Sequence, residues 1–463
     1  MLMVLGVSID GRMPTFVYTP LPSPWSVQSA PLENRRRRAI LERWVKSTAM
    51  VMFAMMSAAA CTQPPTVAPG GSPDSSTTQI GSETAVGGSA PVAPQSTSTA
   101  ATHSVVMLAQ FSGGPGAAGY IHVLDGTTLQ ALARIRAYDP ATQLKPVPGG
   151  RQVLVAQASM EGGGAPTLFV LDVARNTMCR IEEPGVDFAP SADGQKAYNQ
   201  QGTTPINVFD LGDTGSLVGT IDTGDTSLQL YPSPDGQWLV GAEYNEPVVK
   251  LFDTATLQEV DQVSVASDIG AWLGDAFYAL GKEADDRILY RLAPPNLSAV
   301  APLQLTQAGI ALGAEANVGM VTAGTSLALY ARITSGEMFS SRGDMPDDTP
   351  GGIFLLDPTS TSRARHLAAD IDIADLAASP DGHRLYALEV ANEAKPQLMS
   401  LNTATGAITE KRALSDLGDG RWAIAAAELT VPVPTGDIQP QSCPHAEASP
   451  FPTFAEPTPP TNG

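Results

Sequence analysis

The sequence predicts an all-β fold built from seven repeats of four antiparallel strands, and three observations support it. A hairpin turn of the Ser-Pro-Asp-Gly type recurs along the chain, and an apolar strand follows each copy. A further strand in each repeat is followed by a short turn, most often after Asp. Most copies of this strand are spaced about 40–47 residues apart, the length of one four-stranded blade. We therefore predict a seven-bladed β-propeller of four-stranded antiparallel blades, with no helix of convincing periodicity.

The repeat is clearest in residues 231–260. Ser233-Pro234-Asp235-Gly236 predicts a tight turn, because Pro presets φ at the second position and Gly accepts a left-handed backbone. Residues 238–242 form an almost wholly apolar strand, as expected where both faces of a sheet are covered. Residues 248–253 form the next strand, and a turn at residues 254–256 leads into the last one.

The other repeats follow the same plan. The strand that precedes the second turn occurs seven times, at residues 120–125, 168–172, 206–210, 248–253, 288–292, 353–357 and 397–402. The fifth copy departs most, since Ala293-Pro294-Pro295 stands where most others have Asp. The first repeat offers three strands from residue 105 onward. We expect residues 421–426 to supply its fourth strand and close the ring.

These repeats resemble the YVTN family of bacterial β-propellers and their WD-type and lactonase-type relatives. The resemblance rests on SPDG before an apolar strand and on the pattern V-x-L/V-F/L-D-T-A-T-x-x-V, and it covers most of residues 104–434. It implies architecture rather than activity. Related propellers include lactonases and quinoprotein dehydrogenase heavy chains with sites at the channel mouth, but no catalytic residue of theirs maps onto a numbered position here.

The charge is distributed unevenly along the chain. The formal net charge is −20. Residues 1–61 contain seven Lys/Arg and three Asp/Glu, a net charge of +4, which leaves −24 for the remainder. Phosphate binding needs clustered Lys and Arg, so we expect no nucleic-acid partner. Three cysteines are too few for a disulfide scaffold.

The N-terminal region predicts export. Basic residues at 43–46, an apolar core and the small residues before Cys61 form a signal peptide over residues 41–61. Cys61 after three alanines resembles the lipobox of bacterial lipoproteins, which implies a lipidated Cys61 and a protein anchored outside the cytoplasm. Ordinary signal-peptidase cleavage or a chance cysteine is the alternative.

Residues 1–40 fit no part of this scheme, and we interpret them as a non-native or disordered extension, with translation starting at Leu41 or Val45. An unusually long basic region of the signal peptide, or a nucleic-acid or localisation patch at residues 35–38, is the other interpretation.

Two further segments have the composition of disordered chain. Residues 62–103 consist almost entirely of Thr, Ser, Pro, Gly, Ala and Gln, and cannot bury enough apolar surface to fold. We interpret them as a tether between the lipid anchor and the propeller, which spans residues 104–434. The Pro-rich tail, residues 435–463, should be disordered unless Cys443 is bonded.

Few residues suggest a site. An inserted loop at residues 334–352 contains Glu337, Asp344, Asp347 and Asp348, which are weak candidates for a Ca²⁺ site, with a solvated acidic loop as the favoured interpretation. No other cofactor is predicted, and the histidines show no zinc-binding spacing. The repeated aspartates Asp193, Asp235 and Asp381 are explained by turn chemistry. Cys179 and Cys443 form a disulfide in one interpretation; in the other, Cys179 is a small buried residue.

These patterns favour a binding or scaffolding module over an enzyme. We expect a monomer whose partner is an extracytoplasmic protein or a cell-envelope polymer. The alternatives are a propeller enzyme of the lactonase or quinoprotein-dehydrogenase type, with its site at the channel mouth, and a structural cell-wall protein that binds polymer.

Overall fold

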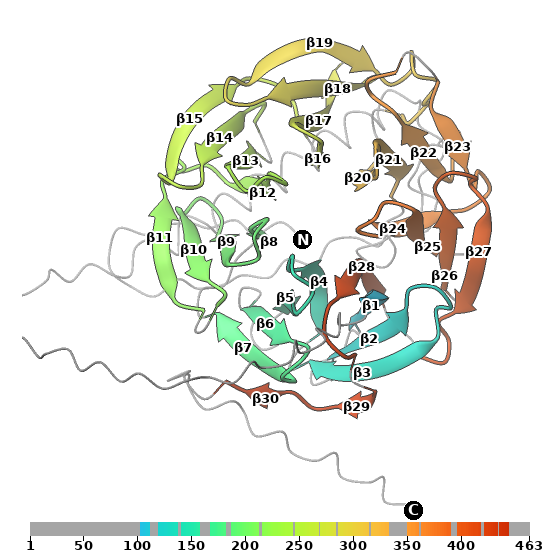
Figure 1. Ribbon diagram of the computed structural model, residues 1–463. Coiled ribbons are helices and arrows are strands. Elements are labelled where there is room, and N and C mark those ends of the chain that lie inside the picture. The colour runs from blue at the N-terminus through green and yellow to red at the C-terminus, as the bar shows by residue number, and fades with distance from the viewer. Residues whose placement is uncertain are drawn as a thin grey trace, which may run out of the picture. The chain divides into compact units, whose positions relative to one another are not determined.

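The chain from residue 102 to residue 443 forms a ring of β-sheets (Figure 1). The computed structural model describes these residues except for 112–118, 138–139, 158–166, 182–186, 213–214, 244–245, 268, 284–285, 314–315, 333–349, 361–362, 390–395, 418–420 and 434. The described residues form strands and turns and no α-helix. They contain no helix that is long and apolar enough to cross a membrane.

Seven sheets surround a common axis, each with a core of four antiparallel strands. This confirms the predicted fold class. We number the blades from the sheet that contains the first strand. Blade 1 contains β28(Arg421–Leu429), β1(His103–Phe111), β2(Gly119–Asp125) and β3(Ala131–Ala137), written from the axis outward. Blade 2 contains β4(Ala141–Pro146), β5(Gln152–Gln157), β6(Thr167–Asp172) and β7(Thr177–Ile181).

The remaining five blades run in chain order from the axis outward. Blade 3 contains β8(Asp187–Pro190), β9(Lys196–Gln200), β10(Ile206–Asp210) and β11(Leu217–Ile221). Blade 4 contains β12(Leu228–Pro232), β13(Trp238–Glu243), β14(Val249–Asp253) and β15(Gln258–Val263). Blade 5 contains β16(Ile269–Leu273), β17(Ala276–Glu283), β18(Asp286–Ala293) and β19(Ser298–Gln304). Blade 6 contains β20(Val318–Ala323), β21(Ser326–Ala331), β22(Ile353–Leu356) and β23(Arg365–Leu367). Blade 7 is β24(Ile373–Ala378), β25(Arg384–Glu389), β26(Gln397–Asn402), β27(Ile408–Ala413).

The ring closes as the sequence predicted. β28, from the C-terminal part of the chain, pairs with β1 in an antiparallel register that runs from His103 opposite Leu429 to Phe111 opposite Arg421. This pairing completes blade 1 and brings the two ends of the propeller together.

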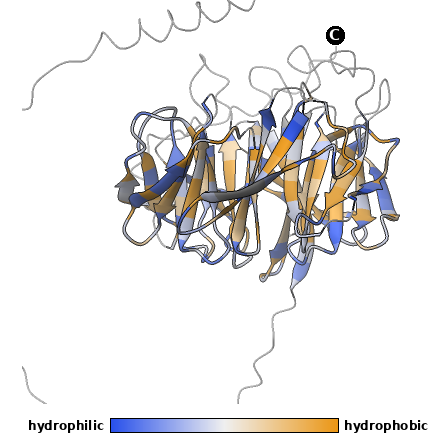
Figure 2. Ribbon diagram, turned by 90° about the horizontal axis from the view of Figure 1, so that it is seen from above, coloured by the Kyte–Doolittle hydropathy of each residue, from blue (hydrophilic) through white to orange (hydrophobic). Residues whose placement is uncertain are grey.

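Each junction between neighbouring blades encloses a hydrophobic cluster of its own. Successive residues of one strand serve different clusters: Val105 and Met107 lie in the cluster shared with blade 2, whereas Val106 and Leu108 lie in the cluster shared with blade 7. Both faces of an inner strand are therefore buried, which explains why these strands are continuous apolar runs. Figure 2 shows the strands standing between the two faces of the disc.

A short C-terminal segment extends two of the blades. β29(Gly436–Ile438) pairs in parallel with β3, and β30(Gln441–Ser442) pairs in parallel with β7 (Figure 1). These strands fall inside residues 435–463, whose composition predicted disorder. The described part of this region ends at Cys443, and the prediction for residues 444–463 lies outside the described residues.

Candidate functional site

The two faces of the ring are built from different connections. Turns of the Ser-Pro-Asp-Gly type join the first and second strands of blades 3, 4 and 7, and short turns join the third and fourth strands. All of these turns lie at one face, which we call the turn face. The second strands end and the third strands begin at the opposite face, which we call the loop face, and the chain also passes from one blade to the next at this face. The longest interval between two strands at this face is residues 332–352, between β21 and β22, most of which lies outside the described part of the chain.

Hydrogen bonds inside the turns account for the recurring aspartates of the turn face. In blade 4 the Ser233 hydroxyl donates to Asp235 Oδ1 at 2.5 Å and accepts from the Trp238 N–H at 2.9 Å. Blades 3 and 7 repeat this arrangement around Asp193 and Asp381. The hydrogen bond from Ser191, followed by that from the Gln195 N–H, lowers the pKa of Asp193. The interpretation of these residues as turn formers is correct.

The aspartates at the ends of the third strands also belong to turns. Asp253 Oδ1 accepts hydrogen bonds from the Ala255 and Thr256 N–H groups and from the Thr256 hydroxyl. Asp125 does the same for Thr127 and Thr128. These carboxylates cap local backbone, and their positions in separate blades do not form a common cluster. Within the residues that the structure describes, no group of three or more His, Cys, Asp or Glu is placed to hold a metal ion.

The innermost strands contain a second set of polar residues, which sequence reasoning missed. At three junctions a side-chain oxygen accepts the N–H of the next blade's innermost strand. Asp187 accepts from Leu230 at 2.6 Å, the Tyr231 hydroxyl from Gly270 at 3.1 Å, and Asp375 from Ile424 at 3.2 Å. A carboxylate or hydroxyl within a short apolar strand is the only sequence signal for this role.

Asp187 also joins a third blade to its junction. Lys145 Nζ, from β4, lies 3.0 Å from Asp187 Oδ1 and donates to the Phe188 carbonyl, with Nζ 4.9 Å from the centroid of the Phe188 ring. Blades 2, 3 and 4 are therefore linked through one carboxylate. Trp272 of blade 5 connects its two neighbouring blades in a similar way. Its indole N–H donates to the Tyr231 carbonyl of blade 4, and its backbone carbonyl accepts from the Thr322 hydroxyl of blade 6.

A partly polar region lies between blades 7 and 1, near the loop face. The His122 side chain is only 3% exposed. Its Nε2 atom lies 3.3 Å from Gln110 Oε1, and its ring centroid lies 5.5 Å from the ring centroid of Trp422. Burial, together with the charges of Arg134 and Arg412, lowers the pKa of His122 to about 4. His122 is therefore neutral at pH 7 and contributes to packing rather than to a cationic site.

The proposed site residues divide between described and undescribed parts of the chain. Cys61, Asp344, Asp347 and Asp348, and the segments assigned to residues 1–40, 41–61 and most of 62–103, lie outside the described residues. Cys179 and Cys443 are described and form a disulfide, with their Cα atoms 5.2 Å apart, a usual separation for a disulfide. In the structure Cys179 is therefore disulfide-bonded to Cys443 rather than an unpaired buried residue.

The comparisons with known proteins concern architecture only. No protein-family model matches the chain, and no curated protein sequence matches it. Among solved structures, the WD40 domain of Toxoplasma gondii coronin is similar at 10% identity and a TM-score of 0.41, over 58% of this chain and 70% of that one. A Bacteroides fragilis protein assigned as a 6-phosphogluconolactonase is similar at 15% identity and a TM-score of 0.44, over 69% of this chain and 97% of that one. The assignment of seven blades here rests on the strand topology itself.

Proposed function

We propose that this protein is a lipid-anchored binding module that faces outside the cytoplasm and presents its loop face to a partner protein. The observation that carries the proposal is the direction of β1. Its first residue, His103, pairs with Leu429 at the end of β28, and innermost strands run from the loop face to the turn face. The chain therefore enters the propeller at the turn face. A tether that begins at Cys61 therefore joins the propeller at the face opposite to the loop face.

The charge of the loop face favours a partner with a basic surface. Among the described residues, the connections at this face contain six Asp/Glu and one Lys/Arg, a net charge of −5, whereas those of the turn face contain five and three, a net charge of −2. Such an excess repels anionic polymers and attracts cationic protein surfaces. We therefore favour a protein over an anionic envelope polymer as the partner.

The disulfide supports the proposed location. Disulfides persist in oxidising environments outside the cytoplasm and are rare inside it. Metabolic labelling with an alkyne fatty acid tests the anchor directly. We expect the full chain to be labelled and to fractionate with membranes, and the Cys61→Ser variant to be unlabelled. Equal labelling of both chains, or of neither, would contradict the anchor.

Site-specific photo-crosslinking tests the binding face. A photoreactive amino acid at exposed Ala369, in the connection between β23 and β24, should capture a partner, and the yield of this capture should fall as salt rises. The matched control places the same amino acid at exposed Ala255 on the turn face, where we expect no capture. Equal capture at both positions would rule out a loop-face partner. Turnover of a sugar lactone or an alcohol by the purified chain would replace the proposal with an enzymatic function.

A further inference from the structure

We propose that the Cys179–Cys443 disulfide is a redox-sensitive latch. Residues 436–443, which we call the strap, lie along the outer edges of β3 and β7. We infer that an external dithiol releases the strap and uncovers these two edges, while the seven-bladed ring remains closed. The inference does not depend on the proposed function.

The non-covalent contacts between the strap and the rest of the propeller are few. β29 pairs with β3 through three residues, and β30 pairs with β7 through two. Asp437 accepts two hydrogen bonds from Arg134, at 2.9 and 2.7 Å, but the two side chains are 72% and 44% exposed. Water and salt weaken an ion pair this exposed. Ile438 is only partly buried against the neighbouring core, Pro440 is buried, and the Gln439 carbonyl accepts one exposed hydrogen bond from Asn176 Nδ2 at 3.3 Å.

The disulfide fixes the far end of the strap. At its near end, Thr430 donates from its N–H to the Gly150 carbonyl at 2.9 Å and from its hydroxyl to the Gly149 carbonyl at 2.8 Å. With Cys443 bonded, the strap is held at both ends and cannot leave its position. With the bond broken it is held at one end only, so the small contacts described above must compete with the entropy of a free segment.

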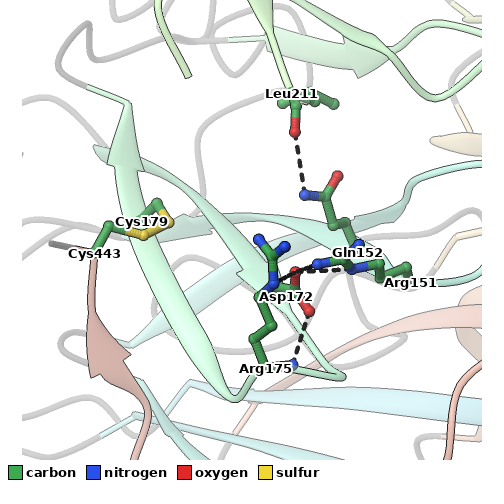
Figure 3. Close-up of a disulfide and its surroundings, with 7 residues drawn as sticks. All are labelled: Arg151, Gln152, Asp172, Arg175, Cys179, Leu211 and Cys443. Atoms are coloured by element: carbon green, nitrogen blue, oxygen red, sulfur yellow. Dashed lines mark hydrogen bonds and ion pairs between the residues drawn. A yellow bond between two sulfur atoms is a disulfide. The ribbon is translucent and has the colours of Figure 1, made fainter. Parts of the chain in front are cut away.

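The strand that carries Cys179 is held independently of the strap. β7 pairs with β6 along its length. Asp172, at the end of β6, receives hydrogen bonds from the Arg151 side chain and from the Arg175 N–H, both at 2.9 Å, which fix the turn between the two strands (Figure 3). β7 therefore stays in place when the strap leaves. The pairing of β28 with β1 also precedes the strap in the chain and does not use it.

The chemistry of release is a thiol–disulfide exchange. A thiolate of the dithiol attacks one sulfur of the disulfide, the S–S bond breaks, and a mixed disulfide forms. The second thiol of the reagent then displaces the bound cysteine. Two electrons and two protons pass to Cys179 and Cys443, and the reagent leaves as a cyclic disulfide. Both cysteines are partly exposed, so the reagent can reach them.

Hydrogen–deuterium exchange tests the latch on the full chain with Cys61→Ser, which leaves Cys179 and Cys443 as its only cysteines. We expect reduction to speed exchange in β3, β7 and the strap by about tenfold or more, because released edges exchange through local opening. Exchange in β1 and β28 should stay unchanged. Cys443→Ser should show the released pattern without reductant, and Asp437→Asn should keep the oxidised pattern.

Two results would overturn the inference. Unchanged protection of the strap after reduction would show that non-covalent contacts suffice to hold it. Loss of protection in β1 and β28 together with the strap would show that the disulfide supports the whole ring rather than the strap.

Discussion

The carboxylate of Asp375 accepts a hydrogen bond from the Ile424 N–H, 3.2 Å away, across the junction where the ring closes. The same carboxylate accepts from the Tyr330 hydroxyl at 3.3 Å and from the Leu376 N–H at 3.1 Å. Four-fifths of the side chain is buried, and this burial raises the pKa of Asp375. One residue of blade 7 thus connects blade 6, blade 7 and the closing strand of blade 1.

Replacement of Asp375 should weaken closure. Asp375→Ala leaves the Ile424 N–H and the Tyr330 hydroxyl without their acceptor, and we expect it to lower the free energy of unfolding by about 3 kcal/mol. Denaturant unfolding followed by tryptophan fluorescence measures this difference. Asp370→Ala, at an exposed position, is the matched control and should change stability by less than about 0.5 kcal/mol. Similar losses for the two variants would refute the bridging role.

His122 should make stability dependent on pH. Its pKa in the folded protein is about 4, below the usual 6.5, so between these values the unfolded state binds more protons. The free energy of unfolding should therefore fall as pH falls from about 6.5 to about 4, by roughly 3 kcal/mol in total. His122→Gln should remove this part of the slope. His383→Gln, at an exposed site, should retain it. Parallel curves for wild type and His122→Gln would contradict the prediction.

The buried serine of the turn should be needed for its geometry. Ser233 is 1% exposed, and its hydroxyl both accepts the Trp238 N–H and donates to Asp235. Ser233→Ala leaves that N–H without the hydroxyl, which should cost about 1–3 kcal/mol. Thermal unfolding of Ser233→Ala beside Ser415→Ala, at an exposed position, checks this value. A melting temperature equal to that of the control would mean that the turn holds without its serine.

Equivalent glycines in two turns should differ in their tolerance of a side chain. Gly236 and Gly382 both adopt a positive φ, +73° and +70°. A Cβ at Gly236 would meet only the Ala192 Cβ, at 3.6 Å, whereas one at Gly382 would lie 2.2 Å from the Gly324 nitrogen. Gly236→Ala should cost about 1 kcal/mol from backbone strain alone. Gly382→Ala should cost at least about 2 kcal/mol more, because two backbones would have to separate.

Equal destabilisation by the two glycine substitutions, measured by denaturant unfolding, would show that the backbone between blades 6 and 7 yields to the added methyl group. The comparison is matched, since the two turns share the sequence Ser-Pro-Asp-Gly, while the atoms of the neighbouring blade that a Cβ would meet differ.

Local chemistry explains why the sequence predicted the architecture well. Ser-Pro-Asp-Gly and Asp-Thr turns are set by contacts within a few residues, so they can be recognised along the chain and counted. The closing strand was also predictable, because the first repeat lacked a strand. The strap was not. Its parallel pairings involve three and two residues, and it is held by Arg134 and by Cys179, both far away in sequence.

The candidate site was less predictable for the same reason. Asp187 and Asp375 lie in innermost strands, and only the arrangement of blades shows that each one accepts an N–H from the next blade. The negative charge of the described loop-face residues was likewise hidden in the overall charge, because these residues are scattered through the chain and only the assembly of the strands shows that they share one face. Cys61 remains a sequence-based prediction.

The pairing of β1 with β28 also governs the fate of incomplete chains. During synthesis, β1 is made first among the strands of the ring and lacks its inner neighbour until residues 421–429 emerge. A product that stops earlier carries an open edge next to the apolar residues Val105, Val106 and Met107. Such an edge is prone to aggregate. A nonsense mutation that falls between β1 and β28 should therefore yield insoluble material rather than a smaller working ring.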